Sequence, residues 1–496
     1  MSGELLSSFG DVLSLTPLAL IVLGTVLGIV VGAIPGLNGA MLVALSLPLT
    51  FGWPPLNAIC FLVGEYVGSI SGGLISATLL NIPGSPSNLM TTQDAMPMAR
   101  SGKAGRALQL GILSSFVGGM VSWLALVTLS PPLAAFALSF GPHEYFALVL
   151  VALVLISSLN EGSQCRALLS GALGILAALP GLDPVTAQPR LDFGFQAMLG
   201  GFDLLAVLVG VFAVSQLLQD AAPARVFERI AVQSSRLQVG LGEFVRHWVN
   251  LLRSAVIGTV IGILPGVGGS VGSIVAYSTA RSLSKARAKF GKGSEEGVIA
   301  SETANNATVG GAIIPMITMG IPGSIIDVIL IAALTLHNLR PGPLLFDTNP
   351  EIVYGFMSSL LVANLVMLAV MLVSIRWLAR LMEVPKAYLV PALLVCCVVG
   401  TYAVNNRLFD VWVMFAFGLI GLLFKGLRFP LGPFVIGFIL APIAEFNLRA
   451  ALIAEEGRWV SFLERPISLV FVAVAALVLI APLLRHLGAI RKDRVA

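Results

Sequence analysis

Charged residues are scarce in this sequence. Only 11% of the 496 residues are Asp, Glu, Lys or Arg, while 57% are hydrophobic, and an ordinary soluble domain has about 25% charged residues. Several apolar runs approach or exceed the roughly 20 residues that a helix needs to cross a bilayer. The composition argues against a soluble enzyme and predicts an all-α, polytopic membrane protein with about 10–14 membrane segments.

Cysteine and histidine are scarce as well. The four Cys and four His lack the spacing of metal ligands or of a disulfide framework. No arrangement of nucleophile and base stands out, and the Gly-rich stretch 266–272 lacks the Lys-Ser/Thr ending of a phosphate-binding loop. We therefore expect no enzyme activity and no cofactor apart from a coupling ion, Na+ or H+.

Lysine and arginine are absent before Arg100. Many of them gather in four basic segments, residues 100–106, 225–253, 281–292 and 485–494, which the positive-inside rule places in the cytoplasm. This predicts a cytoplasmic C-terminus. The first residues also lack the basic stretch of a cleavable signal peptide, so we expect the first apolar segment to be retained.

Two of these basic segments are too close together for a pair of full spans. Only 27 residues separate Arg253 from Arg281, whereas two spans need about 40. The stretch between them is therefore predicted to be a re-entrant hairpin that turns at Pro265-Gly266. Irregular backbone at membrane depth is tolerated where it is buried in protein or lines a cavity, so the turn marks a candidate site.

The same kind of break occurs near the N-terminus, which indicates an internal repeat. At a constant offset of 230, five residues match: Gly28, Gly32, Pro35, Gly36 and Gly39 correspond to Gly258, Gly262, Pro265, Gly266 and Gly269. A second pair, NIPGS at 81–85 and GIPGS at 320–324, matches at an offset of 239. We predict an N-terminal repeat, residues 1–235, and a C-terminal repeat, residues 236–496.

The charge pattern predicts that these halves are inverted, because it puts the ends of the first hairpin outside and the ends of the second inside. Inverted halves with broken helices are typical of secondary transporters. Each break frees carbonyls that can bind a cation, and amides at the positive end of a helix dipole that attract an anion. Residues suited to cap the following helices are Asn38, Ser270, Ser85 before Pro86, and Ser324 with Asp327.

We predict a substrate site at these breaks. The candidate residues are Pro35, Gly36, Asn38, Gly39, Pro83, Gly84, Ser85, Pro265, Gly266, Gly268, Gly269, Ser270, Pro322, Gly323 and Ser324. Neither residues 1–99 nor 297–339 contain Lys or Arg. An anionic substrate would therefore be held by amides, hydroxyls, helix dipoles and a co-bound cation.

Acidic and amide side chains in apolar segments are candidates for ion coupling, because such groups are costly at membrane depth. Glu302, Asn305 and Asn306 share one helix face at i, i+3 and i+4, and Asp94 is a further candidate. A Na+ site near Glu302 and the Pro-Gly loops is one interpretation, and hydrogen bonds that pack helices are the other. For Glu65 and Asp327 both a functional role and a place near a membrane interface stay open.

The longer motifs resemble the large membrane subunit of the tripartite tricarboxylate transporters. They include GAIPGLNGAMLVALSLPLTFG (32–52), NIPGSPSNLMTTQDAMPMARSGKAGRAL (81–108), GTVIGILPGVGGS (258–270) and SETANNATVGGAIIPMITMGIPGS (301–324). The resemblance implies a bacterial inner-membrane carrier of about a dozen helices. It also implies two partners, a small membrane subunit of about four helices and a periplasmic substrate-binding protein.

By the same resemblance, the carrier imports citrate or related carboxylates with a cation gradient. The family's Pro-Gly loops fall on residues 35–36 and 265–266, and its E-x-x-N-N motif falls on Glu302, Asn305 and Asn306. Two residues depart from the family pattern, Asn38 where Gly is usual and Glu65 at an ordinarily apolar position. We predict uptake by alternating access, with a passive anion channel or a stand-alone carrier for another solute as the alternatives.

Overall fold

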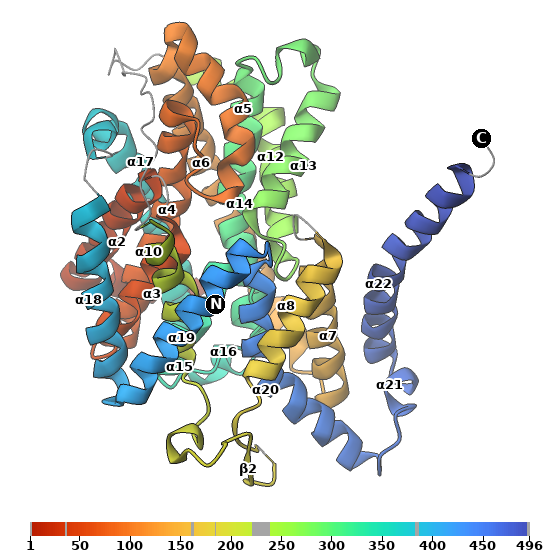
Figure 1. Cartoon of the computed structure of the whole chain (residues 1–496). Helices are drawn as coiled ribbons and strands as arrows, with labels where there is room; N and C mark the ends of the chain where they lie inside the picture. Colours follow the sequence, from red (N-terminus) through yellow and green to blue (C-terminus); the bar gives the residue numbers. More distant parts are fainter. Residues whose placement is uncertain are drawn as a thin grey trace. The chain divides into compact units, whose positions relative to one another are not determined.

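The computed structural model describes residues 2–34, 37–159, 163–183, 185–220, 239–381 and 386–493. In these ranges the regular structure is almost wholly helical (Figure 1). The strands described are one antiparallel pair of two residues each, β1 (Gly181–Leu182) and β2 (Pro189–Arg190). The predicted all-α fold is confirmed.

Six helical stretches in the described ranges are long and apolar enough to cross a membrane. They are Leu15–Ala33, Pro55–Leu80, Pro86–Ala137, Pro350–Ser374, Leu408–Gly426 and Leu431–Ala454. Several shorter apolar helices accompany them, among them Trp248–Ile263 and Ile325–Leu336. The prediction of a multi-pass membrane protein is therefore confirmed.

The chain folds as two compact units, of which the first comprises residues 1–134 and 204–422. Its helices before residue 140 are α1 (Ser2–Val12), α2 (Leu15–Ala33), α3 (Gly39–Ser46), η1 (Pro48–Thr50), α4 (Pro55–Leu80), η2 (Pro86–Asn88), α5 (Leu89–Met98), the π-helical η3 (Ala99–Lys103) and most of α6 (Ala104–Ala137).

The same unit continues with α9 (Leu204–Leu208), the π-helical η5 (Val209–Val214), α10 (Ser215–Asp220), α11 (Leu241–Val245), α12 (Trp248–Ile263), α13 (Gly268–Leu283), η6 (Arg287–Lys289), α14 (Glu295–Met319), α15 (Ile325–Leu336), α16 (Leu345–Thr348), α17 (Pro350–Leu381), α18 (Lys386–Asn405) and most of α19 (Leu408–Gly426).

The second unit comprises residues 135–203 and 423–496. It contains α7 (Pro142–Leu159), α8 (Gln164–Ala177), β1, β2, η4 (Gln196–Met198), α20 (Leu431–Ala454), α21 (Ser461–Glu464) and α22 (Pro466–Asp493). Neither unit coincides with a predicted half, and the predicted boundary at 235/236 lies outside the described residues. The division into halves 1–235 and 236–496 stays a prediction.

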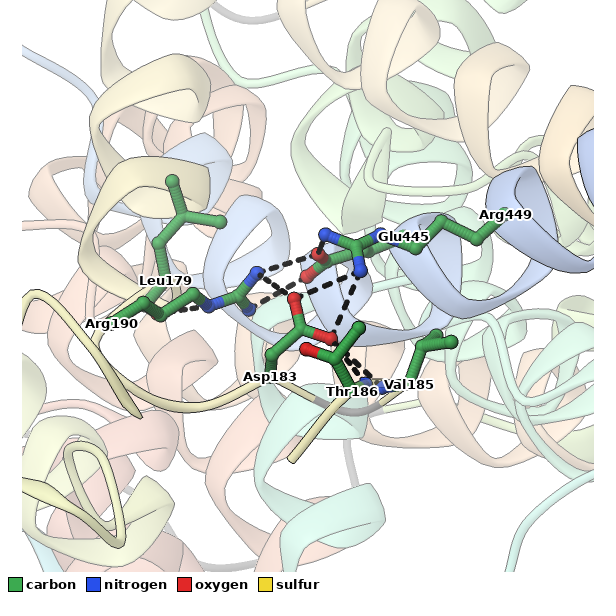
Figure 2. Close-up of polar contacts among 7 residues, drawn as sticks. All are labelled: Leu179, Asp183, Val185, Thr186, Arg190, Glu445 and Arg449. Atoms are coloured by element: carbon green, nitrogen blue, oxygen red, sulfur yellow. Dashed lines mark hydrogen bonds and ion pairs between the residues drawn. The ribbon is translucent and has the colours of Figure 1, made fainter. Parts of the chain in front are cut away.

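Figure 2 shows the polar cluster that anchors the β1–β2 hairpin within the second unit. Arg190 donates to Glu445 through both terminal nitrogens, at 2.6 and 2.7 Å, and through Nε to the Leu179 carbonyl. Asp183 accepts from the backbone N–H groups of Thr186 and Val185 and pairs with Arg449 at 2.8 Å. The hairpin is therefore tied to the last turns of α20.

The repeat is visible in how the long helices of the first unit pack. A Cβ added at Gly28 of α2 would lie 2.5 Å from the Glu65 carbonyl oxygen of α4, and one at Gly258 of α12 would lie 2.4 Å from the Ala304 carbonyl oxygen of α14. Since 258 − 28 is 230 and 304 − 65 is 239, the two contacts follow both sequence offsets. The glycines thus let two helix pairs approach in the same way.

The next turn repeats this correspondence. Gly32 meets the Ser69 carbonyl oxygen, and Gly262 meets that of Thr308, again at offsets of 230 and 239. In each pair the contacts advance together along both helices, so α2 runs parallel to α4 and α12 runs parallel to α14. The internal repeat inferred from the sequence is therefore also a repeat of helix packing.

The two helix pairs run in opposite directions. Ser71 of α4 donates to Asn306 of α14. Gly73, farther along α4, packs against Asn88. Asn88 in turn donates to Glu302, which lies one turn before Asn306 in α14. Farther along α4, the contacts therefore lead through Asn88 of η2 to an earlier residue of α14. This antiparallel arrangement agrees with the predicted inversion.

The basic segments of the two halves meet at one end of the first unit. Arg106, at the start of α6, donates through Nε to Glu295 at 2.7 Å and also pairs with Glu243. Between α5 and α6 the chain bends sharply at Gly102, which has φ +80°. The structure thus groups residues that the charge pattern had assigned to one side of the membrane.

Candidate functional site

The first break lies between α2, which ends at Ala33, and α3, which begins at Gly39. Asn38 caps α3, since its Oδ1 accepts a 2.8 Å hydrogen bond from the Met41 amide, as the sequence predicts. Pro35 and Gly36 lie outside the described residues. The predicted break is present, and the polar residue after it satisfies a helix N-terminus.

The second break lies between α12, which ends at Ile263, and α13, which begins at Gly268. Gly266 and Gly268 have φ values of +69° and +66°, a region that residues other than glycine seldom adopt. Ser270 does not cap the returning helix as predicted. The N-cap is Val267, because the left-handed glycines let the helix begin before Ser270.

The second pair of Pro-Gly elements follows the long helices α4 and α14. Ser324 caps α15 by accepting from the Asp327 amide at 3.3 Å. Ser85 occupies the N-cap of η2 with Pro86 next to it, but its hydroxyl donates to Asn88 Oδ1 at 2.7 Å instead of capping the backbone. Gly84 packs on the Gly32 carbonyl oxygen and Gly323 on that of Gly262, so each element is seated against the end of its own broken helix.

The two halves also reach across to each other at these breaks. A Cβ added at Gly269 would lie 3.0 Å from Ser87 Cβ, and one at Gly39 would lie 3.1 Å from Ile326 Cδ1. Ser87 and Ile326 are themselves equivalent at the offset of 239. The structure therefore brings the four predicted breaks together in two related junctions, each built from both halves.

We call the first of these the Asn305 junction, consisting of Gly269, Asn305, Thr308, Ser85, Ser87 and Asn88. Asn305 is fully buried, and neither atom of its amide makes a hydrogen bond within the described part of the chain. Its Oδ1 lies 2.9 Å from the position of a Cβ added at Gly269. A buried amide without partners is costly, so Asn305 is the candidate residue of this junction for contact with a ligand.

Glu302 lies beside this junction and is fully buried. Its Oε1 accepts from Asn88 Nδ2 at 3.2 Å and from Thr91 Oγ at 2.5 Å, and its Oε2 accepts from Ser115 at 3.2 Å. All three donors are neutral. A buried carboxylate needs a compensating charge, so this geometry suits a carboxyl that carries a cation or a proton.

Asn306 and Asp94 are placed differently from Asn305. Asn306 accepts from Ser71 at 2.7 Å and donates to the Glu302 carbonyl, and so joins α4 to α14. Asp94 accepts from the amides of residues 291, 293 and 294 and from the Tyr277 hydroxyl at 2.8 Å. These contacts support structural roles, and coupling roles for the two residues stay predictions.

We call the other junction the Asp327 junction, consisting of Gly39, Ser69, Tyr66, Ser324, Ile326 and Asp327. The Tyr66 hydroxyl lies 2.9 Å from Ser324 Oγ, which links the two halves directly. Asp327 is fully buried. Tyr66, Asn88, Thr91 and Ser115 were not among the predicted site residues, although the i, i+3 spacing of Asn88 and Thr91 after a break could have indicated a polar face.

Repeated helix pairs, broken helices and polar junctions between them are features expected of a secondary transporter. Residues 18–436 match the family model of the tripartite tricarboxylate transporter TctA family. The chain belongs to this family, and it is therefore a large membrane subunit of the tripartite tricarboxylate transporter type.

Two relatives from Agrobacterium vitis are similar to the chain. One, described as an uncharacterized 52.8 kDa protein in the TAR-I ttuC' 3' region, is 33% identical over 500 residues, which cover 98% of this chain and 97% of the relative. Another, described as an uncharacterized protein in the TAR-II ttuC' 3' region, is 32% identical over 237 residues, or 48% of this chain and 97% of the relative. No solved structure matches the chain.

Proposed function

We propose that the chain is the large permease subunit of a binding-protein-dependent secondary transporter in the bacterial cytoplasmic membrane. It imports tricarboxylates or related carboxylates, driven by a Na+ or H+ gradient. The observation that carries this proposal is the Asn305 junction, where a buried amide without hydrogen-bond partners in the described residues lies where α14, α13 and the 81–88 segment meet.

A carboxylate at this junction would be bound by neutral donors. Asn305 supplies an amide, and Ser85, Ser87 and Thr308 supply hydroxyls. Neither residues 1–99 nor 297–339 contain Lys or Arg. Because a charged substrate needs compensation in a poorly solvated site, a cation held at Glu302 would enter with it. This requirement supports coupling to an ion gradient.

The packing of the halves supports alternating access. Each junction joins the start of one returning helix to the Pro-Gly element of the opposite half, so a rocking motion of one half against the other would open the junctions to alternate sides. Because the substrate lies at the interface, its binding energy acts on the relative position of the halves.

The proposed partners are a small membrane subunit of about four helices and a periplasmic substrate-binding protein, which delivers the solute. The proposed C-terminus is cytoplasmic. The alternatives are a passive anion channel and a carrier that works without a binding protein. Saturation and dependence on an ion gradient distinguish a carrier from a channel, and addition of the binding protein distinguishes the two carriers.

The test is uptake into proteoliposomes that contain the two membrane subunits, across a panel of mono-, di- and tricarboxylates. Na+ and pH gradients are imposed separately, with and without the binding protein. We expect saturable uptake of a tricarboxylate or related carboxylate that needs both the binding protein and one of the gradients. Uptake that follows the substrate gradient alone, without saturation, would instead establish a channel.

A further inference from the structure

The repeat allows the two junctions to be compared residue by residue. At the offset of 239, Ser85 corresponds to Ser324, Asn88 to Asp327, and Glu302 to Val63. At these positions the Asn305 junction has the amide of Asn88 and, next to it, the carboxyl of Glu302. The equivalent residues of the Asp327 junction are Asp327, which has a carboxyl, and Val63, which has none. Each junction therefore has one carboxyl at these two equivalent positions. It belongs to Glu302 of α14 in the Asn305 junction and to Asp327 of α15 in the Asp327 junction.

The carboxyl of Asp327 is fully buried and has nothing to neutralise it among the described residues. The nearest polar groups are Ser324, the Gly323 amide and the Tyr66 hydroxyl, yet neither carboxylate oxygen makes a hydrogen bond of acceptable geometry within the described residues. The described elements that pack on α15, namely α3, α4, α9 and α14, contain no Lys or Arg. Their acidic residues are Glu65, which accepts from Ser46, and those of α14.

A bare carboxylate at such a place would be strongly unfavourable. The oxygens of Asp327, Ser324 and Tyr66 form the kind of ligand set that hard metal cations prefer. A single carboxylate is neutralised by a single positive charge, which favours a monovalent cation over a divalent one.

We propose that Asp327, Ser324 and Tyr66 bind Na+, so that the carrier holds one cation at each junction, at Glu302 and at Asp327. This inference rests on the proposed ion-coupled uptake. It assigns roles to two residues from opposite halves, since Tyr66 belongs to α4 and Asp327 to α15. A cation bound there would hold the halves together at the second junction.

The test is direct binding of radioactive Na+ to the purified full-length protein in nanodiscs, without substrate, with choline replacing Na+ at constant ionic strength. We expect two Na+ per chain in the wild type, one in Asp327→Asn, one in Glu302→Gln and none in the double variant. Asp347→Asn, at an exposed aspartate of α16, is the matched control and should bind two. Asp327→Asn protein that binds as much Na+ as the wild type would overturn the proposal.

Asn occupies the equivalent position 88, so we expect Asp327→Asn to fold, and gel filtration checks this. If it does not fold, Tyr66→Phe decides the question. Removal of that hydroxyl should raise the Na+ concentration for half-saturation of one site about tenfold, while Tyr354→Phe in α17 should not, and an unchanged value for Tyr66→Phe would overturn the proposal. Uptake driven by H+ alone, with no Na+ bound, would reject this site but leave the proposed transport function standing.

Discussion

At the scale of single residues, neighbouring positions of one helix face serve different purposes. The sequence placed Glu302, Asn305 and Asn306 on one face of a helix, and the structure confirms the helix. Their partners, however, come from three directions: α5 and α6 for Glu302, the α13 start for Asn305, and α4 for Asn306. Periodicity predicts a shared face, but only tertiary packing decides which polar group is left for a ligand.

The buried carboxyl of Glu302 leads to a prediction about coupling. Glu302→Gln keeps the shape of the side chain but removes its negative charge, so the site can no longer attract a cation or release a proton. We expect uptake in proteoliposomes to respond less steeply to the Na+ or pH gradient and to fall at least about tenfold.

Thr91→Val is the companion variant for Glu302→Gln, because it removes one neutral donor to the carboxyl and leaves the charge in place. It should weaken the cation dependence without abolishing it. If the Glu302→Gln protein responds to Na+ and to pH as the wild type does, Glu302 has no coupling role.

At the scale of elements, the sequence predicted where helices break but not how the returning helices begin. Pro-Gly pairs and the offset of 230 located both breaks, and the cap at Asn38 was predicted correctly. The cap at Ser270 was wrong, because Gly266 and Gly268 adopt positive φ values and start α13 at Gly268. A single sequence does not reveal which glycine of a Gly-rich turn takes the left-handed conformation.

Substitutions at two adjacent glycines of this turn can distinguish the effect of backbone strain on stability from the effect of an added side chain in the candidate substrate site on uptake. Gly268 has φ +66° and open space around the position of an added Cβ, whereas a Cβ at Gly269 would come within 3.0 Å of Asn305, Ser87 and Thr308. We expect Gly268→Ala to cost about 1–2 kcal/mol of stability while leaving the substrate KM near the wild-type value. Gly269→Ala should raise the KM or abolish uptake, with a smaller loss of thermal stability.

The measurements for this pair are carboxylate uptake kinetics and thermal unfolding followed by size-exclusion chromatography. An equal effect of both alanines on KM would argue against a substrate site at the Asn305 junction. Insertion into the membrane is the common control, and both variants should pass it because neither adds a charge.

The β1–β2 hairpin gives a prediction about pH (Figure 2). The amides of Thr186 and Val185, together with Arg449, lower the pKa of Asp183 to about 2. A lowered pKa means that the ionised carboxyl stabilises the hairpin above its ordinary pKa of about 3.9, and that this stabilisation is lost as the pH falls towards about 2.

We therefore expect Asp183→Ala to speed hydrogen exchange at the Val185 and Thr186 amides at neutral pH, measured by mass spectrometry. In the wild type, the same amides should lose protection, corrected for intrinsic exchange, only below about pH 4. Arg166→Ala in α8, an exposed arginine of the same unit, should leave both amides protected. Unchanged exchange in Asp183→Ala would show that the hairpin is held by other contacts.

At the scale of the whole molecule, the internal repeat was predictable and the two compact units were not. The offsets of 230 and 239 recur in the glycine contacts of α2 with α4 and of α12 with α14, because residues that allow close helix approach must recur wherever the packing recurs. The second unit, in contrast, combines residues 135–203 with 423–496. Such a grouping depends on contacts between distant segments that carry no matching motif.

The predicted inversion of the halves has a testable consequence for sidedness. Ser101 and Arg340 are equivalent at the offset of 239, and inversion places equivalent positions on opposite sides of the membrane. Ser101 is exposed at the bend between α5 and α6, and Leu344 is 64% exposed near Arg340, just before α16. In Figure 1 this bend lies at the top and α16 at the bottom of the first unit.

The experiment places one cysteine at a time, Ser101→Cys or Leu344→Cys, in a chain whose four native cysteines are replaced by alanine or serine. A membrane-impermeant maleimide added to intact spheroplasts should label Leu344→Cys but not Ser101→Cys, and added to inside-out vesicles it should show the reverse. Retained carboxylate uptake by both proteins is the control for folding. Labelling of both cysteines from one side would mean that the halves are parallel, and it would remove the basis for transport by the rocking of inverted repeats.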